Sequence, residues 1–408
     1  SAAWDIAKES FLQPVEWIDQ LKFKASFGQN GNDRLGSSSY YYYAWTDQYQ
    51  ATGADGVWND ATLIFKGNKD LTWEKSNAFN IGFDFSFLQG MFAGTIEYYQ
   101  RQVSDMLFFL PTAPSLGYSS YPANVGSMRN SGVELELTAN IINTKDIQWS
   151  VNANITSMAN KIIKLPKELI ADGYWLNGAR IYKEGESMYN YYLVKYAGVN
   201  HETGEALYWA KDKEGKEFTT TNWSDCYSGN KDKGLVANRA ATGNTMPKAY
   251  GGFGTALNAY GFDLNLSFSY QFGGKLYDNT YAALMHGYTS ADYGTNFHTD
   301  MLNRWTESNK NSDIPRLNAA DQYTSRQSDR FMISSDYLSL NNITLGYTVP
   351  EKLTKKFGVD KIRVYGSAEN VALWSKRRGL DPRQGYGTSN NSTYSPIRTI
   401  SGGIRVEF

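Results

Sequence analysis

Apolar and polar residues alternate along long segments of this chain, and no other feature limits its possible folds as strongly. Between Phe262 and Phe272 every even-numbered residue is apolar and every odd-numbered residue is polar. A helix cannot sort residues in this way, because its faces repeat every 3.6 residues, whereas the two faces of a strand alternate residue by residue. Similar alternation recurs at 79–87, 133–141 and 147–155. The sequence therefore predicts an all-β protein.

The length of these segments favours a membrane protein. Strands of soluble proteins usually have roughly 5–6 residues, whereas a tilted strand that crosses a bilayer needs roughly 9–11. No apolar run approaches the roughly 18 residues of a spanning helix, so such a chain would cross the membrane with strands. Short turns alternate with long stretches rich in Gly, Asn, Ser and Tyr, at 30–76, 110–130, 212–248, 275–333 and 373–396. Short turns at one rim and long loops at the other are typical of outer-membrane β-barrels.

A strand count tests whether this scheme is consistent. If Phe408 lies on the periplasmic side and the chain reverses at every strand, all the long stretches fall on the extracellular rim. About twelve strands satisfy this scheme, with uncertain boundaries. They lie near 20–30, 77–88, 91–108, 131–142, 146–158, 188–197, 206–211, 249–258, 262–274, 334–348, 361–371 and 398–408. Residues 1–4 resemble the end of one more strand, which indicates that the sequence starts partway through a longer polypeptide.

Alternation alone also fits a soluble β-sandwich or a propeller. Strand length and the asymmetry of the loops favour a transmembrane antiparallel barrel that contacts outer-membrane lipid with its apolar stripes. The opposite face carries polar residues of several strands. We expect these either to bond to one another or to contact a passing solute, and the sequence leaves both interpretations open. They are Glu134, Glu136, Asn152, Asn154, Asp263, Asn265 and Ser267.

Composition excludes several other classes of protein. The 40 basic and 41 acidic residues balance, so the sequence predicts no nucleic-acid partner. Cys226 is the only cysteine, which excludes a disulfide framework and a thiolate metal cluster. His201, His286 and His298 lack a carboxylate at helical spacing, so neither a zinc site nor a catalytic triad is indicated. We therefore expect no enzyme, no metal site and no cofactor.

Aromatic residues of the long loops are the candidates for substrate binding. Their planar faces stack on sugar rings, and tyrosine hydroxyls form hydrogen bonds with the ring edges. The alternative is that such residues pack the loops together or contact a partner protein. The candidates are Tyr40, Tyr41, Tyr42, Tyr43, Trp45 and Trp58 in the first long loop and Trp223 in a later one, with Tyr227, Tyr386 and Tyr394 as further possibilities.

Several blocks occur in the order expected of one known family. They are LKFKASFGQNGN (21–32), DLTWEKSNAFNIGFDFSFLQGMFAGTIEYYQRQVSDMLF (70–108), NVGSMRNSGVELEL (124–137), YLSLNNITLGYTVP (337–350), IRVYGSAENVALWS (362–375) and GLDPR (379–383). Together they resemble the SusC/RagA-type TonB-dependent transporters over essentially the whole chain. The segment 398–408 alternates and ends on Phe408, which resembles the terminal strand that the barrel assembly machinery recognises.

This resemblance implies a barrel of roughly 22 strands with a plugged lumen, of which the chain supplies the later half. The plug, the segment that contacts TonB and the earlier strands would precede Ser1. The resemblance further implies a SusD-like surface lipoprotein as partner and TonB-dependent import of an oligomeric nutrient, usually an oligosaccharide and sometimes an oligopeptide. The rival interpretation is a soluble or surface carbohydrate-binding β-protein without transport activity.

Overall fold

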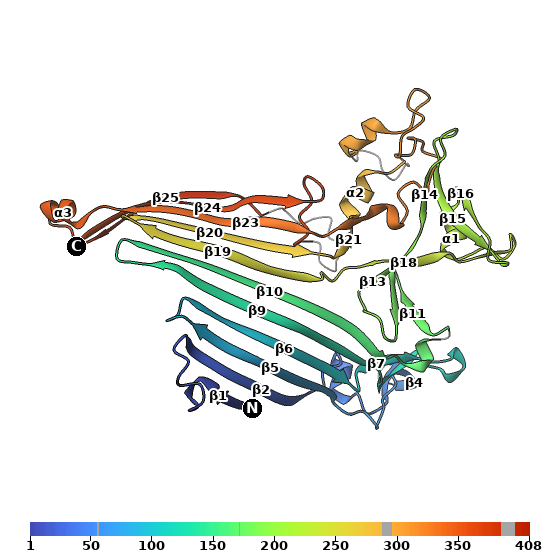
Figure 1. The fold of residues 1–408 in the computed structure, drawn as a ribbon. Coiled ribbons are helices and arrows are strands. Elements are labelled where there is room, and N and C mark those ends of the chain that lie inside the picture. The colour runs from blue at the N-terminus through green and yellow to red at the C-terminus, as the bar shows by residue number, and fades with distance from the viewer. Residues whose placement is uncertain (55–56, 171, 288–295, 385–395) are drawn as a thin grey trace.

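A single antiparallel sheet dominates the computed structural model, which describes residues 1–54, 57–170, 172–287, 296–384 and 396–408. Within these residues the sheet has eleven strands, and each one pairs with its neighbours in chain order. Figure 1 shows the long strands side by side, with short turns at one end and larger structures at the other. The strands are β1 (Ala2–Asp5), β2 (Ile18–Asn32), β5 (Glu74–Phe87), β6 (Phe92–Ser104), β9 (Ser127–Asn143), β10 (Ile147–Lys164), β19 (Ala249–Ala259), β20 (Phe262–Phe272), β23 (Tyr337–Thr348), β24 (Lys361–Ser375) and β25 (Thr399–Glu407).

Ten of the twelve predicted strands lie in this sheet, and β1 is the eleventh member. The strands predicted near 188–197 and 206–211 are wrong as barrel strands. These residues form β13 (Asn190–Val194), β14 (Tyr196–Val199) and β15 (Ala206–Asp212), which belong to two small separate sheets. Their pattern has another cause, because β13 buries Leu193 and Val194 in two protein cores and β15 buries Tyr208 and Ala210 of one face in the second of these cores. Because two strands drop out of the predicted series together, the predicted directions of the other ten strands across the membrane stay the same.

The register of the sheet separates an apolar face from a polar face. Residues that lie directly opposite each other on neighbouring strands point to the same side of the sheet. One such row runs across four strands as Phe83, Ile96, Leu135 and Ile155. The next residues of these strands form the row Asp84, Thr95, Glu136 and Asn154. The sheet is therefore amphipathic across these four strands, as the alternation predicts.

Tight turns join the strands at one end of the sheet, which we call the short-turn end. The hairpin between β19 and β20 turns on Tyr260 and Gly261, whose φ angles are 51° and 90°. Two consecutive residues with positive φ fit the twist of a two-residue hairpin, and glycine adopts that conformation without strain. Between β5 and β6, Asp19 accepts hydrogen bonds from the backbone N–H groups of Gln89 (3.1 Å) and Gly90 (2.8 Å).

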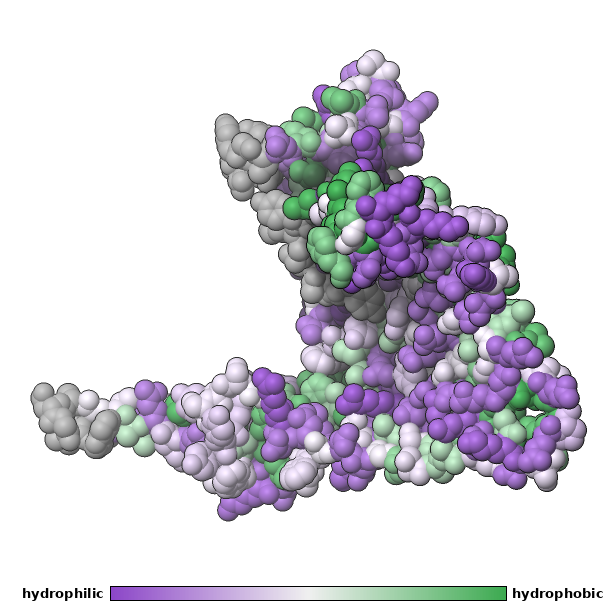
Figure 2. Space-filling view, turned by 90° about the vertical axis from the view of Figure 1, so that its left-hand side faces the viewer, coloured by the Kyte–Doolittle hydropathy of each residue, from purple (hydrophilic) through white to green (hydrophobic). Residues whose placement is uncertain are grey.

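The opposite end carries long connections, and we call it the long-loop end. Seen along the sheet from the short-turn end, the molecule is an open, bent wall with hydrophilic and hydrophobic residues side by side (Figure 2). Between β2 and β5 the chain forms η2 (Ser39–Tyr43), β3 (Gln48–Ala54) and β4 (Val57–Phe65). Between β6 and β9 it forms β7 (Leu107–Pro111), η3 (Pro114–Leu116) and β8 (Ser120–Asn124). Of the described helices, none has the length and apolar character needed to cross a membrane.

Two connections, 165–248 and 273–336, pack into one unit that we call the loop module. The first contains η4 (Lys167–Leu169), β11 (Tyr174–Asn177), β12 (Arg180–Lys183), β13, β14, β15, β16 (Glu217–Thr220), α1 (Trp223–Tyr227), β17 (Leu235–Val236) and β18 (Arg239–Asn244). The second contains β21 (Lys275–Tyr277), α2 (Asn279–Leu284), η6 (Thr299–Asn303), η7 (Asp329–Phe331) and β22 (Met332–Ser334). The remaining short elements are η1 (Ile6–Lys8), α3 (Glu351–Thr354) and η8 (Lys355–Phe357).

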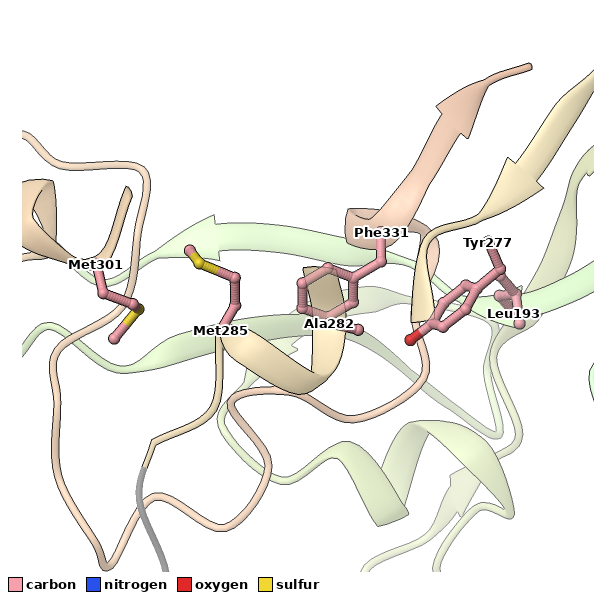
Figure 3. Packing of buried hydrophobic residues seen from close by; sticks show 6 residues of the cluster. All are labelled: Leu193, Tyr277, Ala282, Met285, Met301 and Phe331. Carbon is pink, nitrogen blue, oxygen red and sulfur yellow. The ribbon is translucent and has the colours of Figure 1, made fainter. Parts of the chain in front are cut away.

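Residues from both connections form the hydrophobic cores of the loop module. Leu193 of β13 packs with Tyr277, Met285 and Phe331 of the second connection, and Figure 3 shows these side chains gathered around α2. A second core surrounds the fully buried Tyr208 of β15, whose hydroxyl donates to the carbonyl of Tyr323 at 2.5 Å. Burial of such large apolar surface stabilises a unit that projects beyond the sheet.

Candidate functional site

The tyrosine run of the first long loop forms the short helix η2. Ser38 caps it by accepting a hydrogen bond from the backbone N–H of Tyr40 at 3.4 Å. Because successive residues of a helix point in different directions, the four tyrosines have different environments. Tyr41 packs against Phe109, with ring centroids 5.4 Å apart, and against Phe65. Tyr42, by contrast, is 79% exposed.

A cavity of about 590 Å³ lies beside η2, and we call it the aromatic pocket. Three of the predicted residues line it, namely Tyr41, Tyr42 and Trp45. Tyr43 does not line the pocket but packs edge-on against Trp45 at a centroid distance of 5.5 Å. Two charged residues, Asp33 and Arg34, line the pocket together with the aromatic rings. The pocket thus combines flat apolar faces with hydrogen-bonding groups, which is the pattern of binding sites for polar ring compounds.

Trp73 completes the aromatic pocket, and sequence reasoning missed it. It precedes β5, is 65% exposed and lines the same cavity. Its ring lies against Gly31 of β2, where an added Cβ would overlap the ring atoms. The register of β2 against β5, which pairs Asn32 with Glu74, brings Trp73 to the pocket. The only signal in the sequence is the W-E entry of the block 70–108, which we used to identify the family and not the site.

Polar contacts at the base of the loop hold the pocket wall in place. Asp47 pairs with Lys66 at 2.8 Å and accepts a hydrogen bond from the backbone N–H of Gly67 at 3.0 Å. The hydrogen bond from Lys66 holds the pKa of Asp47 below its usual range. The side-chain amide of Gln48 donates to the carbonyl of Tyr40 at 2.6 Å. These contacts fix both ends of the β3–β4 hairpin relative to η2.

The other predicted aromatic residues do not join the aromatic pocket. Tyr40 is exposed beside it, whereas the side chain of Trp58 lies outside the described residues, as do Tyr386 and Tyr394. Trp223 belongs to the loop module, where its ring stacks on Tyr227 at 4.5 Å. Its indole N–H donates to the carbonyl of Gln327 at 2.8 Å. These contacts join the two connections of the module.

The single thiol and the acidic side chains of the described residues do not form a reactive centre. Cys226 is fully buried, and burial raises the pKa of its thiol to about 12. A thiol of such pKa stays protonated at neutral pH and is a poor nucleophile. Among the described residues, no group of three His, Cys, Asp or Glu side chains is arranged to hold a metal ion. Phe408 follows β25, and its side chain is exposed.

We expect Asp329 to make the stability of the loop module depend on pH. Burial raises the pKa of its carboxyl above the usual value, although the carboxylate accepts a hydrogen bond from the backbone N–H of Tyr196 at 2.7 Å. A pKa that is higher in the folded than in the unfolded state stabilises folding fully below the unfolded pKa. This contribution is lost as the pH rises through the folded pKa. Asp329→Asn, which keeps the acceptor, is therefore expected to flatten the decline in stability above about pH 4.

Hydrogen exchange of the module amides, corrected for the intrinsic effect of pH on exchange, measures this change. The full-length protein serves as the sample. Asp232→Asn is the control, because Asp232 is exposed in the same module and its side chain forms no hydrogen bond or ion pair with the described residues. Equal pH profiles for wild type and Asp329→Asn would contradict the assignment.

Comparisons with known proteins agree with this geometry. Residues 4–180 match the family model described as TonB dependent receptor-like, beta-barrel. The TonB-dependent receptor P3 of Formosa agariphila is 29% identical over all of this chain and 41% of its own length. TonB-dependent receptor SusC of Bacteroides thetaiotaomicron is 26% identical over 99% of the chain and 39% of its own length. The relatives are named as receptors and not as enzymes, and the chain spans about two fifths of their length.

Solved structures give the same result for the fold. The RagAB peptide transporter superposes with a TM-score of 0.78 at 26% identity, over all of this chain and 43% of that one. The RagAB peptide importer in its open-open state gives 0.81 at the same identity, with 42% of its chain covered. TonB-dependent receptor barrels are outer-membrane proteins whose strands present an apolar face to lipid and a polar face to the lumen. Residues 4–180 therefore match the β-barrel of the TonB-dependent receptors, and the whole chain is similar in sequence to SusC and in fold to the RagAB transporter.

Proposed function

We propose that the chain forms the later half of the barrel wall of a receptor that imports an oligomeric nutrient across the outer membrane. TonB supplies the energy through parts of the receptor outside this chain, and a SusD-like lipoprotein assists at the cell surface. In this proposal the long-loop end is extracellular and the short-turn end is periplasmic. The asymmetry of the connections supports that orientation, because long loops are extracellular in outer-membrane barrels.

The aromatic pocket is the observation that carries the proposal. Tyr42, Trp45 and Trp73 present exposed rings at the long-loop end, and Asp33 and Arg34 add hydrogen-bonding groups beside them. Aromatic faces bind the apolar faces of sugar rings and the side chains of peptides alike. We infer that the pocket contacts the cargo before it enters the barrel. Tyr40, Tyr43, Trp58 and Trp223 remain weaker candidates for the same role.

The class of cargo is open to two readings. The resemblance of the sequence blocks to the SusC/RagA-type transporters favours an oligosaccharide, whereas the similar RagAB structures are of a peptide transporter and a peptide importer. A strain that lacks the receptor, grown on a panel of oligosaccharides and oligopeptides, distinguishes the two. Loss of growth on one class identifies the cargo, and normal growth on every member would refute the import function.

The double variant Tyr42→Ala/Trp45→Ala tests the role of the pocket. Each aromatic contact contributes roughly 0.5–1.5 kcal/mol beyond its buried area. Loss of both rings is therefore expected to weaken cargo binding to the full-length receptor about tenfold, since 1.4 kcal/mol corresponds to a factor of ten. Binding is measured by calorimetry on the purified receptor and uptake by growth on the identified cargo.

Trp209→Ala is the matched control, because Trp209 is an exposed tryptophan of β15 that does not line the pocket. It is expected to bind cargo as the wild type does. Suppose that deletion of the receptor abolishes uptake of the cargo, but the double variant binds this cargo as tightly as the wild type does. This result would show that the cargo binds outside the aromatic pocket.

A further inference from the structure

The segment that follows β24 is rich in arginine and borders a second cavity. Arg377, Arg378, Arg383 and Arg398 line this cavity of about 530 Å³, which we call the arginine pocket. One carboxylate, that of Asp381, lines it as well. Figure 1 shows the end of β24 close to β21 and α2, so the pocket lies at the long-loop end of the sheet. The lining is therefore strongly cationic although the chain as a whole is nearly neutral.

Two of the four arginines form the fixed walls of the pocket. Arg377 donates to the carboxylate of Asp278 from Nε at 2.8 Å and from Nη2 at 2.5 Å. Both of these donors share the Oδ2 atom of Asp278, whereas Arg383 donates to both oxygens of Asp381, at 2.8 and 2.7 Å, and also to Ser339 at 3.0 Å. Both carboxylates are buried. Paired guanidinium groups in such geometry hold their positions and leave little charge free.

Arg378 and Arg398, the other two arginines of the pocket, form no ion pair with a carboxylate of the described residues. Both are exposed. Residues 385–395, which connect the two parts of the pocket wall in sequence, contain no Asp or Glu. Among the described residues, two guanidinium groups without a carboxylate partner therefore border a cavity whose other charged side chains form ion pairs.

The register shows which face of the sheet this cavity is on. Ser339, which accepts the hydrogen bond from Arg383, lies opposite Ser269, and that residue lies opposite Gly252. The same row continues through Asn154 to Glu136, which belong to the polar face. Arg383 therefore lies on the side of the sheet that faces the barrel lumen in this family.

We propose that the arginine pocket binds an anionic group of the cargo, a carboxylate or a sulfate, at the entrance of the lumen. This inference rests on the import function proposed above and adds a preference for acidic oligomers. Arg378 and Arg398 match such groups, because a guanidinium offers parallel N–H donors to two oxygens of one anion. A cationic entrance also raises the local concentration of anionic oligomers and speeds their association.

Binding of matched probes to the purified full-length receptor tests the inference. The anionic probes are tetragalacturonate and a tetra-aspartate peptide, and the neutral probes of equal length are galactotetraose and a tetra-asparagine peptide. The wild type is expected to bind at least one anionic probe about tenfold more tightly than its neutral counterpart at low salt, because two charge-assisted contacts are added. The probe that shows the preference distinguishes a uronic acid from an acidic peptide.

The double variant Arg378→Gln/Arg398→Gln is expected to lose this tenfold preference and to keep its affinity for the neutral probe. Both side chains are exposed and unpaired, so the variant should fold as the wild type does. Arg405→Gln is the matched control. It removes one exposed arginine of β25 at the short-turn end, where Arg405 pairs with Glu407 at 2.9 Å.

Three results would overturn the inference. The first is equal binding of the anionic and neutral probes by the wild type. The second is an unchanged preference for the anionic probe in the double variant. The third, measured with vesicles that contain lipopolysaccharide, is binding of the wild type to these vesicles and to neither soluble anion. In each case growth of the deletion strain decides separately whether the receptor imports a nutrient at all. The anion preference and the import function can therefore fail independently.

Discussion

Replacing Asp278 by alanine is expected to destabilise the loop module by about 2–4 kcal/mol, because breaking a buried ion pair leaves its partner without a counterion. The carboxylate of Asp278 is 4% exposed and accepts two hydrogen bonds from Arg377, whose side chain is 21% exposed. It also caps α2 by accepting a hydrogen bond from the backbone N–H of Tyr281 at 3.0 Å. Residual contact of Arg377 with water keeps the expected loss below the upper limit for a fully buried pair.

Hydrogen exchange of the amides of 275–287 in the full-length receptor measures this loss. Asp278→Asn separates the two roles of the carboxylate, since the amide oxygen still caps α2 but carries no charge. We expect it to fall between wild type and Asp278→Ala. Glu351→Ala is the control, because the pair of Glu351 with Lys355, at 2.5 Å, is exposed at the other end of the sheet. Unchanged protection of 275–287 in Asp278→Ala would contradict the role given to this pair.

The long strands could be predicted from the sequence because two different solvents face the two sides of the sheet. Lipid on one side and a wet lumen on the other force apolar and polar residues to alternate over the whole length of each strand. Phe262 to Phe272 gives the plainest example, and β20 has those bounds. Because the strands pair in chain order, the order of the predicted strands along the sequence also gives their order in the sheet.

The small strands of the loop module show where that reasoning stops. Tyr208 and Ala210 are both fully buried on one face of β15, so one-sided burial in a protein core produces the same alternation as lipid does. The alternation shows which residues are shielded from water, but it does not distinguish lipid from a protein core as their surroundings. The alternation therefore predicts barrel strands at 188–197 and 206–211, whereas these residues pack against the second connection.

The candidate sites show a similar limit. Tyr41, Tyr42 and Trp45 could be predicted as a group because they are neighbours in sequence. Trp73 reaches the aromatic pocket only through the register of β2 and β5, which the sequence does not specify residue by residue. The contact of Arg377 with Asp278 joins residues 99 positions apart, and no local pattern indicates it.

Removal of the Tyr208 ring is expected to have the largest effect on the loop module. The side chain is fully buried among Val194, Ala206 and Cys226, and its hydroxyl donates to the carbonyl of Tyr323 in the second connection. Loss of a fully buried aromatic ring costs about 3–5 kcal/mol, because the surrounding residues cannot close the cavity. Burial raises the pKa of Tyr208 well above its usual range, so the hydroxyl stays protonated and acts as a donor throughout.

Tyr208→Ala should therefore increase hydrogen exchange in both connections together, in β15 of the first and in 320–331 of the second. If the two connections were stabilised separately, only β15 would lose protection, and the loop module would not be one unit. Tyr208→Phe isolates the hydrogen bond, and we expect it to cost about 0.5–1.5 kcal/mol. Phe218→Ala is the control, because Phe218 is an exposed ring on β16 of the same small sheet. Its removal should leave the exchange of 320–331 unchanged, since an exposed ring leaves no cavity between the connections.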